Sequence, residues 1–214
     1  MHELFGAIKS GDAEAVEGLL DREPGLVDAV QDGVTAILWA LYVGKRELAR
    51  LLVERGASVS FPEAAALGEL ERVRVMLEEN PALLDERSAD GYPPLGLAIF
   101  FGQPDVARLL IERGADVHAQ AANAQRVAPL HAAAAVCDRD LVRLLLDRGA
   151  DPNAKQQLDY TPLHTAAARN DREMAALLLA RGADREARGS DGLTPAGVAE
   201  KYGHPEFAEW IRGA

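Results

Sequence analysis

A stretch of about 33 residues recurs along this chain, and this repetition limits the possible folds more than any other feature. The segment GADPNAKQQLDYTPLHTAAARNDREMAALLLARGAD, residues 149–184, falls into register with earlier and later segments. Seven positions, each just after the first helix of a repeat, are spaced by 33, 24, 34, 35, 33 and 33 residues: Gly11, Gly44, Gly68, Gly102, Cys137, Asn170 and Gly203. Such a period predicts a stack of seven small supersecondary units.

Each repeat carries start and stop signals for two short helices. Pro94, Pro129 and Pro162 stand where a first helix begins, because the first turn tolerates a missing N–H. Glycines follow the helices, where a left-handed turn ends them. Helices of about eight to ten residues are not stable alone in water. The sequence therefore predicts a repeat fold in which each helical pair buries its apolar side on its neighbours.

The repeats resemble ankyrin repeats at the motifs GADPNAK, TPLHTAAARND, APLHAAAA and DGLTPAGVAEKYGHPE, over nearly the whole chain. The stretches DREPGLVDAVQDG and EENPALLDERSADG are similar to those of bacterial-type ankyrin repeat proteins. The resemblance implies an all-α repeat, an ankyrin-repeat solenoid of about seven helix-turn-helix units with β-hairpin fingers. It also implies protein–protein binding through a concave groove rather than catalysis. We expect one domain over residues 1–214, with repeats at 1–30, 31–57, 58–88, 89–122, 123–156, 157–189 and 190–214.

The third repeat is shorter than the others. Only 24 residues separate Gly44 from Gly68, and GASVSFPEAAALGELERV lacks an Asp-Gly turn. We therefore expect the finger between repeats two and three to be missing or reduced to a bend. Two interpretations stay open, a neutral shortening of a loop and a notch that lets a partner reach the first helices.

The resemblance also implies which side chains face the groove. In the family the two residues before the glycine of each first helix point into it, and a finger residue lies beside them. The candidates for partner binding are therefore Tyr42, Val43, Leu67, Tyr92, Phe100 and Phe101. One of the two phenylalanine rings can instead pack beneath the adjacent finger, because successive helical residues point about 100° apart.

The charge distribution suggests the chemistry of the partner. The chain has a net charge of −11, and residues 1–107 hold 19 acids and 9 bases, a net of −10. This balance argues against nucleic acid and against anionic membranes, which both require clustered Lys and Arg. Asp32, Glu86 and Asp90 are candidate contact residues for a protein or peptide that is apolar with basic flanks. A solvated acidic face is the alternative explanation.

No pattern in the sequence indicates an enzyme, a cofactor or a metal site. His131 and His164 occupy the position at which a histidine bridges backbone groups in the resembling family, and no zinc-binding spacing is present. One cysteine, Cys137, no basic leader and no long apolar run favour a cytoplasmic protein. We expect a monomeric binding module, with an accessory subunit of a bacterial enzyme and a self-associating scaffold as alternatives.

Overall fold

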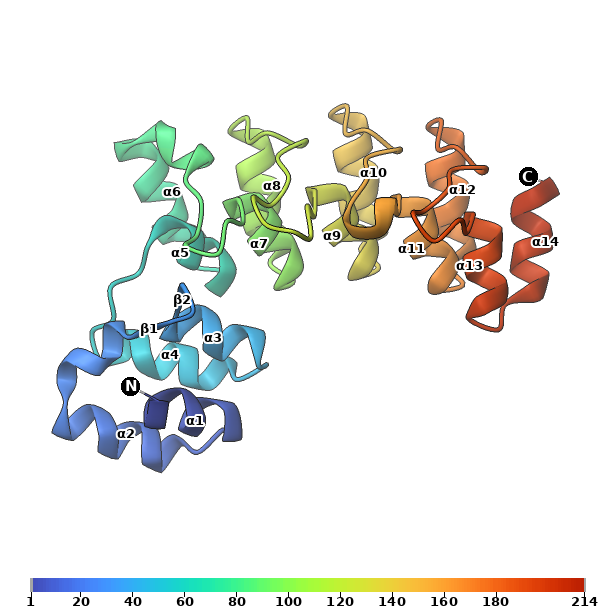
Figure 1. The fold of residues 1–214 in the computed structure, drawn as a ribbon. Helices are drawn as coiled ribbons and strands as arrows, with labels where there is room; N and C mark the ends of the chain where they lie inside the picture. The colour runs from blue at the N-terminus through green and yellow to red at the C-terminus, as the bar shows by residue number, and fades with distance from the viewer. Residues whose placement is uncertain (1, 214) are drawn as a thin grey trace. The chain divides into compact units, whose positions relative to one another are not determined.

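The computed structural model describes residues 2–213, and in that range the chain forms seven successive pairs of short helices (Figure 1). The prediction of an all-α repeat fold is confirmed. The chain divides into two compact units, an N-terminal half that ends at Leu109 and a C-terminal half that starts at Leu110. The expectation of one domain over the whole chain stays a prediction.

The N-terminal half contains four helical pairs and the boundary falls within the last helix. The α-helices are α1 (His2–Ser10), α2 (Ala13–Arg22), α3 (Ala36–Tyr42), α4 (Arg46–Glu54), α5 (Phe61–Leu67), α6 (Leu70–Glu79), α7 (Pro94–Phe100) and α8 (Pro104–Glu112). Two 3-10 turns precede fingers, at η1 (Pro24–Asp28) and η2 (Pro81–Asp85). Strands β1 (Val30–Gln31) and β2 (Val34–Thr35) pair antiparallel in the first finger.

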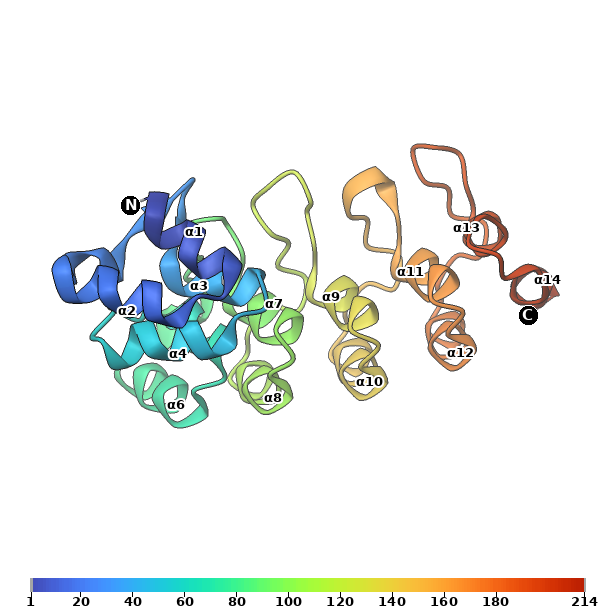
Figure 2. The same cartoon turned by 90° about the horizontal axis from the view of Figure 1, so that it is seen from below.

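The C-terminal half contains three helical pairs. Its helices are α9 (Pro129–Ala135), α10 (Arg139–Asp147), η3 (Gln157–Asp159), α11 (Pro162–Ala168), α12 (Arg172–Ala180), α13 (Pro195–Lys201) and α14 (Pro205–Gly213). Figure 2 shows three long loops of this half projecting from the same side of the helices. These loops are the fingers, and within the described residues none of them contains a regular strand pair. Each is closed by single backbone bonds such as that from Gln156 N to Tyr160 O, 3.0 Å.

The helices begin and end where the sequence signals predict. The side-chain oxygen of Thr35 accepts a hydrogen bond from Leu38 N, and that of Thr194 accepts one from Gly197 N. These caps satisfy amides that have no partner inside the helix. The residue after the first helix is left-handed in each repeat, as at Gly44 with φ 75°, and Cys137 and Asn170 adopt the same conformation with φ 59° and 54°.

The missing finger between repeats two and three is confirmed. Helix α4 ends at Glu54 and α5 begins at Phe61, whereas α10 ends at Asp147 and α11 begins at Pro162. The short segment leaves no room for a hairpin turn. Instead it is held by Asp28, whose carboxylate accepts a hydrogen bond from Ser58 N at 2.7 Å.

Small apolar side chains fill the interior of both halves. The fully buried residues include several alanines of the first helices α5, α7, α9 and α11, namely Ala65, Ala98, Ala133 and Ala167. Between residues 2 and 213, no helix is both long and apolar enough to cross a lipid bilayer.

Candidate functional site

Three aromatic rings from α3 and the C-terminal end of α7 pack together in the N-terminal half. The ring centroid of Tyr42 lies 5.2 Å from that of Phe101 and 6.1 Å from that of Phe100. The two phenylalanine rings lie 5.1 Å apart and are nearly perpendicular, at 82°. Edge-to-face contacts at these distances are favourable beyond the area that they bury.

The two phenylalanines have different environments. Phe101 is only 7% exposed and belongs to the hydrophobic core of this half, which favours the alternative that one of the two rings packs. Its role in partner binding stays a prediction. Phe100 is 49% exposed. The difference follows from the helical turn between successive residues, which directs one ring inward when the other points out. Arg46 also fixes the end of α7, because its guanidinium donates a hydrogen bond to the carbonyl oxygen of Phe101.

Tyr42 connects this cluster to the next finger along the chain. Its hydroxyl donates to Asp90 Oδ2 at 2.7 Å, and Ser88 Oγ donates to Asp90 Oδ1 at 2.5 Å. Burial of the ring, and then the hydrogen-bonded Asp90 carboxylate, raise the pKa of Tyr42 above its ordinary value. The phenol is therefore neutral at physiological pH and acts as a hydrogen-bond donor.

The remaining apolar candidates lie around these rings. Val43, Leu67 and Tyr92 are half-buried and pack against the core of the N-terminal half. Together with Tyr42 and Phe100 they form a surface that we call the aromatic face, defined by Tyr42, Val43, Leu67, Tyr92 and Phe100. Phe100 is its most exposed member, and the ring of Tyr42 lies beside it.

The three acidic candidates have separate roles. Asp32 is exposed and left-handed, with φ 52°, in the turn that it forms with Gly33. Asp90 is half-buried and bonded to Tyr42. Glu86 is half-buried, and its burial and the nearby Glu63 carboxylate raise its pKa. The half that carries the aromatic face, residues 1–109, holds 19 acids and 10 bases, a net charge of −9.

A buried carboxylate that sequence reasoning missed organises this region. Glu63 is 3% exposed at the start of α5. It accepts hydrogen bonds from Thr35 Oγ1 at 2.5 Å, from Ser60 N at 2.8 Å and from Ser60 Oγ at 2.6 Å. The signal was present, because Ser60-Phe61-Pro62-Glu63 aligns with Thr161-Pro162-Leu163-His164 of a regular repeat. Glu63 stands at the position of His164. Its carboxylate accepts a hydrogen bond from Thr35 of the preceding repeat, whereas His164 binds the carbonyl oxygen of Leu193 in the following finger.

The loss of one finger brings repeats two and four into contact. Tyr42 of repeat two touches both phenylalanines and Asp90 of repeat four. A β-carbon on Gly33, at the tip of the first finger, would lie 4.0 Å from the carbonyl oxygen of Ala89. These contacts favour closure of the row of fingers over an open notch between repeats two and three.

The two buried histidines are structural. His164 Nε2 lies 3.2 Å from Leu193 O, and His131 Nε2 lies 3.2 Å from Tyr160 O. Burial lowers the pKa of His131 to about 4 and also lowers that of His164. Both imidazoles are therefore neutral at pH 7, and each bonds a backbone carbonyl of the following finger.

The single cysteine of the chain, Cys137, lies in a left-handed turn, and its side chain is exposed. No cluster of three His, Cys, Asp or Glu side chains between residues 2 and 213 is arranged to hold a metal ion.

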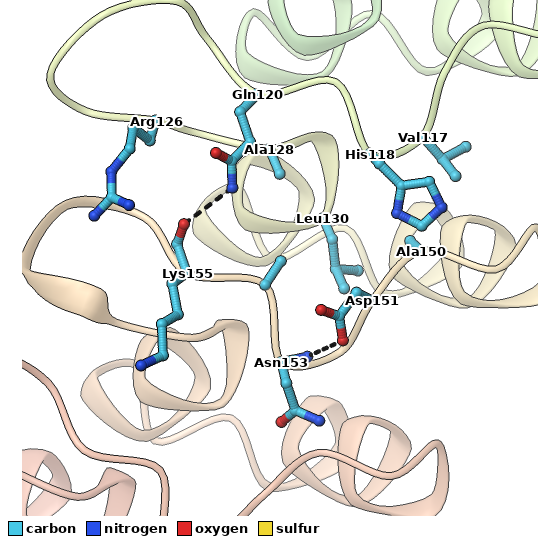
Figure 3. A pocket seen from close by; sticks show the side chains of 11 residues that line it. Val117, His118, Gln120, Arg126, Ala128, Leu130, Ala150, Asp151, Asn153 and Lys155 are labelled. Carbon is cyan, nitrogen blue, oxygen red and sulfur yellow. Dashed lines mark hydrogen bonds between the residues drawn. The ribbon is translucent and has the colours of Figure 1, made fainter.

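A polar pocket of about 380 Å³ lies between two fingers of the C-terminal half (Figure 3). Val117, Ala128, Leu130 and Ala150 supply apolar lining, and polar side chains surround them. Several of the polar groups are already bonded to the protein. Gln120 donates to the carbonyl oxygen of Lys155 at 3.0 Å, and Asp151 accepts from Asn153 N at 2.8 Å. The pocket is thus largely a space between adjacent fingers.

Known proteins share the repeat pattern of this chain. A family model described as "Ankyrin repeats (3 copies)" matches residues 130–214, and one described as "Ankyrin repeat" matches residues 90–122. The chain is 32% identical over 120 residues to the "Probable 26S proteasome regulatory subunit p28" of Saccharomyces cerevisiae, which covers 50% of this chain and 52% of that protein. It is 33% identical over 122 residues to "Ankyrin repeat and SAM domain-containing protein 6" of Mus musculus, which covers 56% of this chain and 11% of that protein. These matches span about half or less of each relative.

Proposed function

Because the chain belongs to the ankyrin-repeat family, we propose that it binds a partner protein through the aromatic face of its N-terminal half. The protein is a protein–protein interaction module without a catalytic role of its own, acting in the cytoplasm. The observation that carries the proposed contact surface is the exposure of Phe100. Its ring is 49% exposed although it touches two other rings.

Exposure of the Phe100 ring lowers the stability of the free protein. Full burial of a phenylalanine side chain is worth about 1.5–3 kcal/mol, and whole domains are stable by only about 5–15 kcal/mol. A half-exposed ring on a rigid support recovers this free energy when a partner covers it. Aromatic anchors of this kind contribute much of the binding energy in protein interfaces.

The acidic groups define the partner further. Asp32 is exposed, and the half that carries the aromatic face has a net charge of −9. The partner is therefore a protein or peptide with an apolar segment flanked by basic residues. Such charge complementarity accelerates association and selects partners more than it adds to affinity.

The experiment compares capture by matched single variants of the full chain. Phe100→Ala removes the exposed ring, and Val75→Ala removes an apolar side chain of similar exposure, 50%, on α6. The wild type and Val75→Ala are expected to retain the same partner from a native extract, and Phe100→Ala to lose at least about tenfold, or 1.4 kcal/mol. Equal capture by all three proteins excludes the aromatic face.

An accessory subunit of an enzyme is the second candidate function. It is favoured by the similarity to the "Probable 26S proteasome regulatory subunit p28" of Saccharomyces cerevisiae. In that case the protein is expected to co-elute in a fixed ratio with a catalytic partner during size-exclusion chromatography. A free adaptor leaves the column alone once the extract is diluted.

Self-association through the aromatic face is less favourable on electrostatic grounds. Two copies of a surface from a half with net charge −9 repel each other when they pair symmetrically. We expect a monomer in sedimentation velocity for both the wild type and Phe100→Asp. A dimer that Phe100→Asp dissociates would replace the foreign partner with a second copy.

A further inference from the structure

The finger that leads to α11 differs in sequence from other fingers of the chain. Three fingers carry Asp-Gly at the tip, in the segments QDGV at 31–34, ADGY at 89–92 and SDGL at 190–193. The aligned segment at 157–160 is QLDY. Leu158 therefore stands in the place of the aspartate and Asp159 in the place of the glycine.

This replacement puts a leucine and an aspartate into a left-handed turn. Leu158 has φ 62° and Asp159 has φ 57°, close to the conformation of Asp32 and Gly33 with φ 52° and 79°. Glycine adopts positive φ freely and aspartate adopts it with modest cost, whereas a bulky leucine at positive φ is an outlier. Backbone strain of this kind persists only where the surroundings enforce it, and it is concentrated at functional sites.

The surroundings hold the tip from both sides. Gln157 N donates to Gln125 O at 2.9 Å in the preceding finger, and Ser190 N donates to Leu158 O at 2.8 Å in the following finger. At the base of the turn, Gln156 N donates to Tyr160 O at 3.0 Å. The backbone of Leu158 is thus bonded into a frame that spans three fingers.

Within this frame the leucine side chain points to solvent. Leu158 is 54% exposed, which makes it one of the most exposed large apolar residues among those described. Burial in the core therefore does not explain why a leucine occupies a strained turn. An apolar side chain on a backbone that is already held in place loses less entropy when a partner covers it than one on a mobile loop.

Near the tip of this finger the acidic side chains have partners, whereas two basic side chains have no carboxylate partner. Asp159 is 3.3 Å from Arg126, and Asp191 accepts a hydrogen bond from the Tyr160 hydroxyl at 2.7 Å, so both acids are engaged. Lys155 lies in the same finger and Arg188 in the following one, where Arg188 donates a hydrogen bond to Gly192 O at 3.0 Å. Both side chains are exposed, and within residues 2–213 neither has a carboxylate at ion-pair distance, so the fingers beside the leucine carry positive charge that no carboxylate neutralises.

We propose that Leu158 is the anchor of a second contact surface, which inserts into an apolar socket with an acidic rim on a partner protein. This surface lies in the C-terminal half and is chemically opposite to the aromatic face, which favours basic flanks. The proposal does not depend on the aromatic face, because the two surfaces use different residues of different halves.

Two variants distinguish the contribution of the leucine side chain to binding from the effect of the strained turn on stability. Leu158→Asn removes the apolar side chain and supplies a residue that tolerates positive φ. Asp159→Gly relieves the turn but keeps the leucine. We expect both proteins to melt at or above the wild-type temperature, because each removes an unfavourable conformation.

Contact is measured with full-length chains that carry p-benzoylphenylalanine in place of Leu158, or in place of Val75 as a control of similar exposure. After irradiation in an extract of the producing cells, crosslinked peptides are identified by mass spectrometry. We expect position 158 to yield a discrete partner whose crosslinked segment is apolar and rich in Asp and Glu. An excess of unlabelled wild type or of Asp159→Gly is expected to compete for the partner and to suppress the crosslinked product. Leu158→Asn is expected to compete at least about tenfold more weakly.

Four outcomes of the crosslinking experiment overturn the proposal. These are equal competition by Leu158→Asn, crosslinking no greater than at position 75, a basic crosslinked segment, and a product formed only with a second copy of this chain. A fall in melting temperature of Leu158→Asn well below the wild type also contradicts it, because the leucine would then be needed for folding. Loss of binding through Phe100→Ala leaves all of these outcomes unchanged.

Discussion

The hydroxyl of Tyr42 donates a 2.7 Å hydrogen bond to Asp90, a residue 48 positions further along the chain. It joins the first helix of repeat two to the finger of repeat four and passes over the repeat between them. The contact exists because the shortened third repeat has no finger of its own. The geometry of the aromatic face therefore depends on a bond that the regular repeat pattern does not contain.

Removal of this hydroxyl is expected to destabilise the N-terminal half. Tyr42→Phe keeps the ring contacts with Phe101 but leaves the half-buried Asp90 carboxylate without its phenol donor. A hydrogen bond to a charged group contributes roughly 1.5–3 kcal/mol, so the melting temperature should fall by about 3 °C or more. The measurement is thermal denaturation followed by Trp39 fluorescence in a Trp210→Phe background, since Trp39 packs on Phe5 in this half.

Tyr202→Phe serves as the matched control for that experiment. Tyr202 is 59% exposed, so loss of its hydroxyl should change stability by less than about 0.5 kcal/mol. If the two variants melt at the same temperature, the bond between Tyr42 and Asp90 contributes nothing to the fold.

Alanine substitutions of the two adjacent phenylalanines are expected to have different effects, one mainly on stability and the other mainly on partner binding. Phe101→Ala empties a core position that is 7% exposed and should cost about 3–5 kcal/mol in urea unfolding. Phe100→Ala affects a half-exposed ring and should cost about 1 kcal/mol or less of stability while it weakens partner capture at least about tenfold. Equal losses of stability would mean that Phe100 is a core residue in solution.

The different burial of these two rings illustrates which structural features could be predicted from the sequence and which could not. The repeat period, the helix boundaries and the missing finger were predictable, since they follow from local Pro and Gly signals and from a count of residues. Which ring is buried was not predictable, because it depends on how closely the finger at Asp90 approaches α3. Glu63 and Leu158 were visible as departures from aligned segments, but the burial of Glu63 and the backbone angles of Leu158 depend on contacts between repeats that are distant in the sequence.

Glu63 is expected to be important for the stability of the N-terminal half. Glu63→Ala leaves the Thr35 hydroxyl and both donors of Ser60 without their acceptor in a region closed to solvent. An unsatisfied buried donor costs about 1–3 kcal/mol, so a loss of about 3 kcal/mol or more is expected in urea unfolding. Glu78→Ala, at an exposed position on α6, should change stability by less than about 0.5 kcal/mol. Similar small effects of both changes would contradict the role of Glu63.

Glu86 should make stability depend on pH in the opposite direction from a salt-bridged acid. Its folded pKa is raised, first by burial and then by the charge of Glu63, so ionisation of Glu86 disfavours the folded state. This cost is present above the folded pKa and disappears as the pH falls below the ordinary glutamate pKa. Glu86→Gln is therefore expected to melt at a higher temperature than the wild type at pH 7, with a difference that vanishes near pH 4. A difference that stays constant across that range would show that the substitution acts through packing instead.

The cap of α9 offers a way to stabilise the C-terminal half. His131 Nδ1 is buried and, among the described residues, has no hydrogen-bond partner, whereas His164 Nδ1 bonds both the backbone N–H and the hydroxyl of Thr161. The residue at the equivalent cap position before His131 is Ala128, which lines the pocket between two fingers and so has space beside it. Ala128→Thr should supply the missing hydroxyl, both to His131 and to the first-turn amides, and raise stability by about 1 kcal/mol, or 2–4 °C in melting temperature. Ala128→Val has the same shape without the hydroxyl and is expected to give no such gain. Equal melting temperatures for the threonine and valine variants would show that any change comes from side-chain volume alone.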